Sequence, residues 1–298
     1  GLASESAFSF VRLGQIVSRS PDHVRALWQH AFSTRISPHF PDVNAIGSLF
    51  ALGTVCWLTI ALGQKLSPRN RAGAIAGTLV MAVTLWLTGS RAALGAAVLT
   101  GFLMWWQLRR PSLTTMAATL AIAGTIGLSL VTANAARTPR ASIETASSIR
   151  LELAMVGIRI AAAHPWFGVG LGEFSAHSTQ YISPQLIEQF PQAAYGENAH
   201  NELIQVLGEL GLIGLVVFVW YWIVVLAPPL RRFRAFPADH GKSDPWLLAW
   251  TSGLCAFHLS ALLGHPFLTP YVVYCVFLSV GVVAGLSPDE SRTLSRRS

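Results

Sequence analysis

Two arginines and one histidine, each at the border of an apolar segment, are the side chains in this sequence best suited to chemistry. Arg91 directly precedes an apolar run, Arg150 heads a segment with helical spacing, and His200 lies in the polar run ENAHNE at 197–202. A guanidinium is planar, permanently charged and able to bind phosphate through two hydrogen bonds. An imidazole can accept a hydroxyl proton near neutral pH. The arginines therefore predict an anion clamp, and His200 predicts a general base.

Ordinary structural explanations compete with these predictions. Arg91 could extend toward lipid headgroups with its stem along the apolar run, and Arg150 could be a solvated loop residue. The pair His200-Asn201 is of a kind that is more often structural than catalytic. Residue types and positions alone leave both explanations open.

Three further histidines compete with His200 for the role of a base. His164 precedes a proline and has the position of a helix stop. His258 lies within an apolar run, where a neutral, hydrogen-bonded ring is expected, although an ionisable group inside a membrane is functional by default. His265 lies at a turn and could line the mouth of a cavity.

Other polar residues could support such a site. Glu209 could orient His200 or form a hydrogen bond with a neighbouring helix. No Ser-His-Asp order, phosphate-binding glycine loop or pair of metal-binding carboxylates stands out. The possible supporting residues are Asn201, Glu209, Arg159 and His265.

Apolar helices must position these residues. Because a membrane-spanning helix needs roughly 20 mostly apolar residues, the apolar runs predict seven spans and an all-α, polytopic membrane fold. The predicted spans are Ala45–Leu62, Ala72–Leu87, Ala92–Trp106, Leu113–Val131, Leu203–Leu226, Trp246–Leu263 and Leu268–Leu286.

Basic residues alternate between the loops that join these spans. The positive-inside rule assigns the Lys- and Arg-rich loops to the cytoplasm, which places 1–44 and 132–202 in the periplasm of a double-membrane bacterium. The chain then divides into an outer segment 1–44, four spans in 45–131, an outer catalytic loop 132–202, three spans in 203–286 and a cytoplasmic tail 287–298. The basic residues of the cytoplasmic loops are Lys65, Arg69, Arg71, Arg109, Arg110, Arg231, Arg232, Arg234, Lys242, Arg292, Arg296 and Arg297.

The outer loop 132–202 is too long to be an ordinary connection. Residues 147–163 predict a helix that Ser147 and Ser148 cap, that ends at His164-Pro165, and that a glycine-rich turn follows. We expect this helix to lie on the membrane surface and to cover a cavity. Its expected apolar face consists of Leu151, Ala154, Met155, Ile158 and Ala162.

The composition excludes an ordinary soluble protein. Hydrophobic residues make up 52% of the chain and charged residues 12%, against about 25% charged residues in soluble domains. The net charge of +7 lies mostly in the cytoplasmic loops, so it indicates topology rather than nucleic-acid binding. Cys56, Cys255 and Cys275 lie inside apolar runs without metal-binding spacing and are expected to be buried thiols. Because the chain starts with Gly1 and lacks a signal-peptide pattern, we expect further spans upstream.

Four motifs, in order, resemble the O-antigen ligase and O-antigen polymerase superfamily. LTGSRAALG at 87–95 resembles the family's SRxxxxG element, and Arg150 with HPWFGVGLGEF at 164–174 is similar to its R…hPxxGvGxGxF stretch. HNELIQVLGELGLIG at 200–214 resembles HNxxLqxlxExGxxG, and FPDVNA at 40–45 resembles the element that precedes a span. The likeness covers roughly residues 35–226 with consistent order and spacing.

The resemblance implies a GT-C-like, inverting glycosyltransferase that needs no sugar nucleotide, cofactor or metal ion. Its donor would be a glycan on undecaprenyl diphosphate at the periplasmic face of the inner membrane. Arg91 and Arg150 would bind the diphosphate, and His200 would deprotonate the acceptor hydroxyl. These three residues are the expected catalytic set.

The acceptor stays open at this point. Lipid A–core would make the protein an O-antigen ligase, which we favour narrowly. A glycan repeat would make it a polymerase, and a serine or threonine would make it a protein O-oligosaccharyltransferase. The segment Ser175–Gly196 is expected to shape that choice. A carrier or transporter of polyprenyl-diphosphate glycans, or a structural membrane subunit, is the non-enzymatic alternative, although the sequence contains no convincing internal repeat.

Overall fold

The protein is built from helices. The structure, a computed structural model, describes residues 42–63, 66–109, 112, 114–115, 140–235 and 245–286, and these ranges contain no strand. The all-α prediction is therefore confirmed for them, whereas the segments 1–41 and 287–298 lie outside the described residues. The helices are α3 Val43–Leu62, α4 Pro68–Thr88, α5 Arg91–Arg109, α7 Arg140–Ala163, α8 Phe174–Ser178, α9 Pro184–Gln189, α10 Glu202–Ala235, α11 Pro245–Ala261 and α12 Pro270–Leu286, with short 3-10 helices at Pro191–Tyr195 and Pro266–Leu268.

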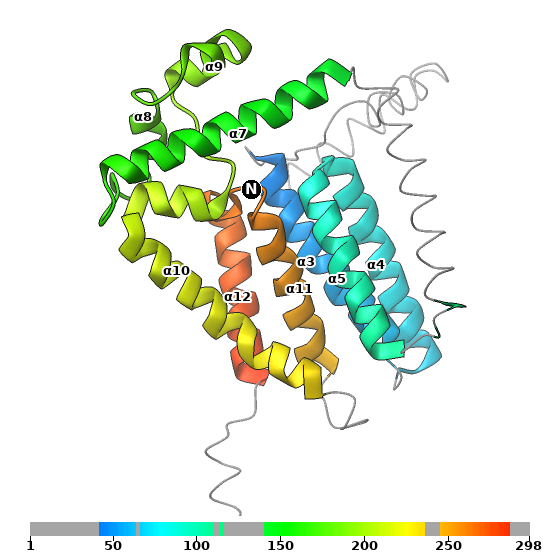
Figure 1. The fold of residues 1–298 in the computed structure, drawn as a ribbon. Coiled ribbons are helices and arrows are strands. Elements are labelled where there is room, and N and C mark those ends of the chain that lie inside the picture. The colour runs from blue at the N-terminus through cyan, green and yellow to red at the C-terminus, as the bar shows by residue number, and fades with distance from the viewer. Residues whose placement is uncertain are drawn as a thin grey trace, which may run out of the picture.

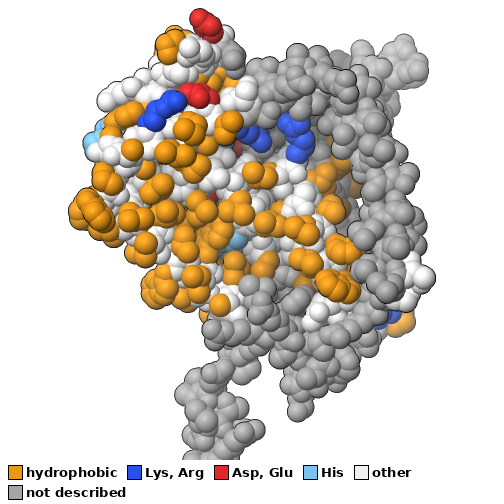
Figure 2. Space-filling model, viewed as in Figure 1, with side chains coloured by type: hydrophobic (Ala, Val, Ile, Leu, Met, Phe, Trp, Pro, Cys, Tyr) orange, Lys and Arg blue, Asp and Glu red, His pale blue; other side chains and the backbone are white. Residues whose placement is uncertain are grey.

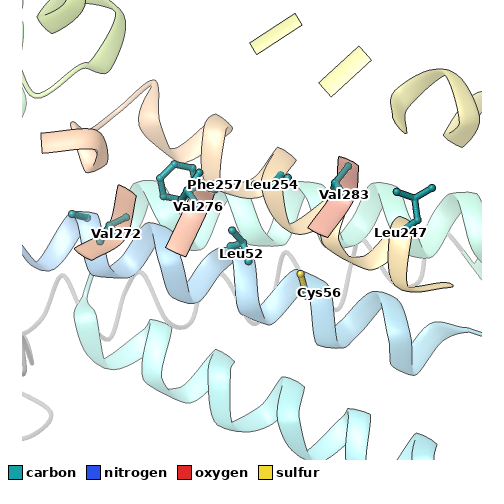
Figure 3. Close-up of a cluster of buried hydrophobic side chains, with 9 residues drawn as sticks. Leu52, Cys56, Leu247, Leu254, Phe257, Val272, Val276 and Val283 are labelled. Carbon is teal, nitrogen blue, oxygen red and sulfur yellow. The ribbon is translucent and has the colours of Figure 1, made fainter. Parts of the chain in front are cut away.

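Helix α3 forms the centre of the bundle and packs against α4, α5 and α11 (Figure 1). Leu52 of α3 lies in a buried apolar cluster with residues of α11 and α12 (Figure 3). A Cβ at Gly253 of α11 would come within 2.7 Å of the Leu52 carbonyl oxygen. Such close backbone approach is typical of helix packing in membranes, and it explains how α11 reaches α3.

All predicted spans within the described residues coincide with helices, and the span predicted at 113–131 lies largely outside those residues. Three described helices are long and apolar enough to cross a bilayer, namely 43–62, 68–88 and 202–227, and 270–286 is a shorter apolar helix. Large apolar side chains on α10 are exposed, among them Val216 and Trp220, as expected of a lipid-facing surface. The chain is therefore a membrane protein.

One expectation about buried thiols differs from the structure. Cys56 is buried, but Cys275 is exposed on α12, because α12 turns only one side toward α3 and α11. A helical run that is apolar all round does not reveal which side contacts protein and which contacts lipid.

Helix α7 lies across one end of the bundle (Figure 1). It ends at Ala163 as predicted, but it begins at Arg140, so Ser147 and Ser148 lie inside the helix and do not cap it. The apolar stripe predicted from sequence is not the one that packs against protein: Leu151, Met155 and Ile158 are exposed. The buried apolar residues in the described part of α7 include Leu153, Val156, Ile160 and Ala161.

The choice of the buried stripe has a physical explanation. Two apolar stripes run along α7, and the buried one is selected by its partners, Phe174 and Ala199 on one side and Leu186 and Ala193 on the other. The helical period alone cannot distinguish the two stripes.

Helix α10 bends at Gly211, whose φ of 64° and ψ of −164° are not helical, and Figure 1 shows the helix changing direction there. The turn after α7 fills the break: Leu212 N donates to the Pro165 carbonyl at 2.8 Å and Gly170 N donates to the Glu209 carbonyl at 2.8 Å. Added Cβ atoms at Gly168 and Gly211 would come 2.3 Å from opposing backbone atoms, and both residues have positive φ. The turn therefore couples the end of α7 to the start of α10.

Candidate functional site

The polar run at 197–202 is held in place by hydrogen bonds from its own ends. Asn201 caps α10, since its Oδ1 accepts from Ile204 N at 3.1 Å, and its Nδ2 donates to the Leu262 carbonyl at 2.7 Å. Glu202 Oε2 accepts from Phe267 N at 3.1 Å. These two long-range bonds attach the turn between α11 and α12 to the residues that follow His200.

Glu209 acts on this run through Gln205. Gln205 Nε2 donates to Glu209 Oε1 at 2.9 Å and to Asn198 Oδ1 at 3.0 Å, and its Oε1 accepts from Ala199 N at 2.9 Å. Among the described residues, Glu209 forms a hydrogen bond neither with His200 nor with a neighbouring helix, the two roles considered from sequence. It orients the amide that fixes the backbone next to His200.

His200 has a left-handed backbone, with a φ of 51°, and is the non-glycine residue with positive φ among the described residues. This conformation costs an L-residue roughly 1–2 kcal/mol. Such strain persists where surrounding contacts impose it, and it concentrates at functional sites. The hydrogen bonds on both sides of His200 supply that constraint.

The His200 ring lies between a carboxylate and a second imidazole. Its Nε2 is 3.7 Å from Glu197 Oε1, and its ring centroid is 4.6 Å from that of His265. His265 Nε2 in turn is 3.4 Å from Asp42 Oδ2. Segments that are far apart in the sequence thus meet at the end of the bundle covered by α7.

Arg91 and Arg150 belong to the same group of charges. Arg91 begins α5 and Arg150 lies in α7, and neither guanidinium forms an ion pair or hydrogen bond within the part of the chain that the structure describes. Burial and the nearby Arg91 lower the pKa of Arg150, while Asp42 raises it. Basic side chains gather at this end of the molecule, beside a broad hydrophobic surface (Figure 2). Two neighbouring cations that have no partner among the described residues form a place for an anion.

The histidines are held in the neutral form. Burial lowers the pKa of His200 from 6.5, Arg150 lowers it further, and Glu197 and Asp42 act in the opposite direction. Burial and the neighbouring His200 lower the pKa of His265 to about 4. A neutral imidazole at neutral pH can accept a proton, so His200 has the ionisation state that a general base requires.

The remaining sequence candidates lie elsewhere. Arg159 forms an ion pair with Glu152 at 3.1 Å and donates to the Tyr181 carbonyl at 2.9 Å. It lines an open pocket of about 460 Å³ between α7 and α9, on the opposite side of α7 from Arg150. His164 follows the end of α7, as expected of a helix stop, and His258 is buried in α11, where its Nδ1 donates to the Leu254 carbonyl at 2.8 Å.

Asp42 and Glu197 are the residues of this group that sequence reasoning did not single out. In the sequence, Asp42 lies in the motif before the first predicted span and Glu197 lies in the polar run, and neither position by itself indicated a role in the site. A carboxylate at a helix N-cap is ordinarily a capping residue, so sequence gave no reason to place Asp42 in a site. The described residues contain no group of three or more His, Cys, Asp or Glu side chains arranged to hold a metal ion.

A family model described as O-antigen ligase matches residues 76–219. The match runs from within α4 to within α10 and includes Arg91, Arg150 and His200, whereas Asp42 and His265 lie outside it. No curated protein matches the chain. The family resemblance drawn from the motifs is therefore confirmed.

Proposed function

Since the chain belongs to the O-antigen ligase family through residues 76–219, a glycosyltransferase activity of that general type follows, and we propose its donor, geometry and residues. The donor is a glycan linked to undecaprenyl diphosphate, the acceptor is a hydroxyl group, and the configuration at the anomeric carbon inverts. The acceptor we favour is lipid A–core, which makes the protein an O-antigen ligase. No metal ion or cofactor takes part in this proposal.

The observation that carries the proposal is a neutral His200 near Arg150, which lies near Arg91, with neither guanidinium paired among the described residues. Arg91 and Arg150 bind the diphosphate and stabilise the charge that grows on it as it departs. His200 takes the proton of the acceptor hydroxyl, and the acceptor oxygen attacks the anomeric carbon from the face opposite the diphosphate. The bond between that carbon and the diphosphate oxygen breaks, and the electron pair leaves with undecaprenyl diphosphate.

The membrane placement is part of the proposal. Seven helices cross the inner membrane, and the end of the bundle that carries α7 faces the periplasm. The N-termini of α3 and α5, the start of α10 and the turn after α11 all lie at this end (Figure 1), as the alternation of basic loops requires.

Cysteine labelling tests the orientation. Tyr195 is 91% exposed, so a Tyr195→Cys substitution presents a thiol without disturbing a contact. We expect a membrane-impermeant maleimide to label it in spheroplasts. Ser67→Cys, at the opposite end of the bundle, is the matched control and should be labelled only after lysis. The reverse pattern would invert the topology.

Purified full-length protein, lipid-linked glycan and an acceptor test the activity. Transfer should release undecaprenyl diphosphate in proportion to acceptor consumed. Tight donor binding without release would favour the carrier alternative. In a deletion strain, loss of lipopolysaccharide capping supports the ligase, loss of chain length supports a polymerase, and loss of protein glycans supports an O-oligosaccharyltransferase.

A further inference from the structure

Asp42 has two different environments at its two carboxylate oxygens. Oδ1 accepts a hydrogen bond from Asn44 N at 2.7 Å and caps α3. Oδ2 is buried, accepts no hydrogen bond from the described residues, and lies 3.4 Å from His265 Nε2. Helix capping therefore uses Oδ1 and leaves Oδ2 directed at His265, whose ring packs against that of His200.

The position of His265 is set by the residues that follow His200. The turn that carries His265 is attached at Leu262 to Asn201 and at Phe267 to Glu202, one bond on each side. The His265 side chain is 9% exposed and its ring packs against that of His200. Rotation of the His265 side chain would remove this contact, and Asp42 Oδ2 lies 3.4 Å from the Nε2 of the same ring.

The charges around the two histidine rings make the Asp42 carboxylate important when His200 accepts a proton. The charged groups that act on the two rings are Arg150 from α7, Glu197 from the run before α10, and Asp42 from α3. Arg91 from α5 lies near Arg150. When His200 becomes an imidazolium, it adds a cation near Arg150, which already lies near Arg91. A carboxylate on the other side of the rings offsets that repulsion.

We propose that Asp42 is a positioning residue for the proton acceptor: its carboxylate holds His265 against His200 and balances the positive charge that His200 gains when it deprotonates the acceptor hydroxyl. The proposal rests on the proposed function of His200. In the step concerned, the acceptor O–H bond breaks, its proton bonds to a ring nitrogen of His200, and the acceptor oxygen uses the electron pair to bond to the anomeric carbon. The bond between that carbon and the diphosphate oxygen breaks, and its electron pair leaves with undecaprenyl diphosphate. Asp42 neither gains nor loses a proton.

The substitution Asp42→Asn separates capping from charge, because asparagine caps helices as well as aspartate does. Asp42→Ser is a second cap-preserving variant. Ser67→Asn is the matched control, since Ser67 caps α4 at the opposite end of the bundle. The assay is glycan transfer by the full-length protein over a range of pH, with donor binding measured separately.

We expect the Asp42→Asn protein to bind donor normally and to turn over more than tenfold more slowly than wild type. This loss should be smaller than the loss of the base itself, which is worth roughly 10²–10⁴-fold. The acidic limb of the pH profile should move to lower pH. The shift follows because Asp42 raises the pKa of His200. The control variant Ser67→Asn should keep both the turnover of the wild type and the acidic limb of its pH profile.

An unchanged acidic limb in folded Asp42→Asn protein would reduce Asp42 to a helix cap and overturn the proposal. Failure of both cap-preserving variants to fold would do the same, because it would assign Asp42 a structural role. A wild-type profile without an acidic limb, or normal transfer after substitution of His200, would instead overturn the proposed function itself. The two failures are therefore distinguishable.

Discussion

Replacing His200 by asparagine should abolish most of the transfer activity without disturbing the fold. The backbone of His200 is left-handed, with a φ of 51°, and asparagine adopts this conformation more readily than most residues. His200→Asn therefore keeps the local backbone while it removes the basic nitrogen. His200→Gly, which relieves the left-handed strain of roughly 1–2 kcal/mol, is a second variant in which unfolding is not the cause of lost activity.

The expected loss in turnover is about 10²–10⁴-fold, the usual contribution of a general base. It corresponds to an increase of roughly 2.7–5.4 kcal/mol in the activation barrier. Because Arg91 and Arg150 carry the donor diphosphate in this mechanism, donor affinity should change little. Wild-type turnover should fall as the pH drops through the pKa of His200, which burial places below 6.5.

The assay is release of undecaprenyl diphosphate under single-turnover conditions, with donor affinity and thermal stability measured on the same preparations. If His200 only holds the polar run in place, the asparagine variant should lose donor binding or folded yield in step with activity. Near-normal transfer by well-folded His200→Asn or His200→Gly protein would refute the base and leave the arginines as the proposed site.

Arg91→Lys and Arg150→Lys should each impair donor binding and turnover together, because an ammonium cannot form the two parallel hydrogen bonds of a guanidinium; full rescue by lysine, measured by donor titration, would contradict the clamp. Gly168→Ala and Gly211→Ala should each lower the melting temperature and the yield of folded protein, since both positions combine positive φ with a backbone clash at 2.3 Å; wild-type melting of either variant would show that α10 does not need the bend. Stability should fall as the pH drops from 6.5 toward 4, because the pKa of His265 is lower in the folded protein, about 4, than in the unfolded chain, so protons bind preferentially to the unfolded state. Thermal melts of wild type and His265→Phe measure this dependence, and an equally steep fall in both proteins would assign it to other groups.

Local sequence determined the helical elements. A run of about 20 apolar residues satisfies its backbone polar groups internally and matches the bilayer, so α3 and α4 were predictable within a few residues. His164-Pro165 ends α7 because the residue before a proline avoids the helical conformation. The types of Arg91, Arg150 and His200 indicated their chemistry for the same local reason, namely that charge and proton affinity belong to the side chain.

Tertiary structure alone decided which side chains meet. Asp42 and His265 approach one another because α3 packs against α11 through Gly253, and neither apolar run records that contact. The bend of α10 depends on the turn at 165–170, which supplies hydrogen bonds to the backbone groups that Gly211 leaves open. The buried face of α7 depends on partners such as Phe174. Packing, not periodicity, chooses among equally apolar faces and brings together groups separated by more than 200 residues, and the charges that surround His200 are set by that choice.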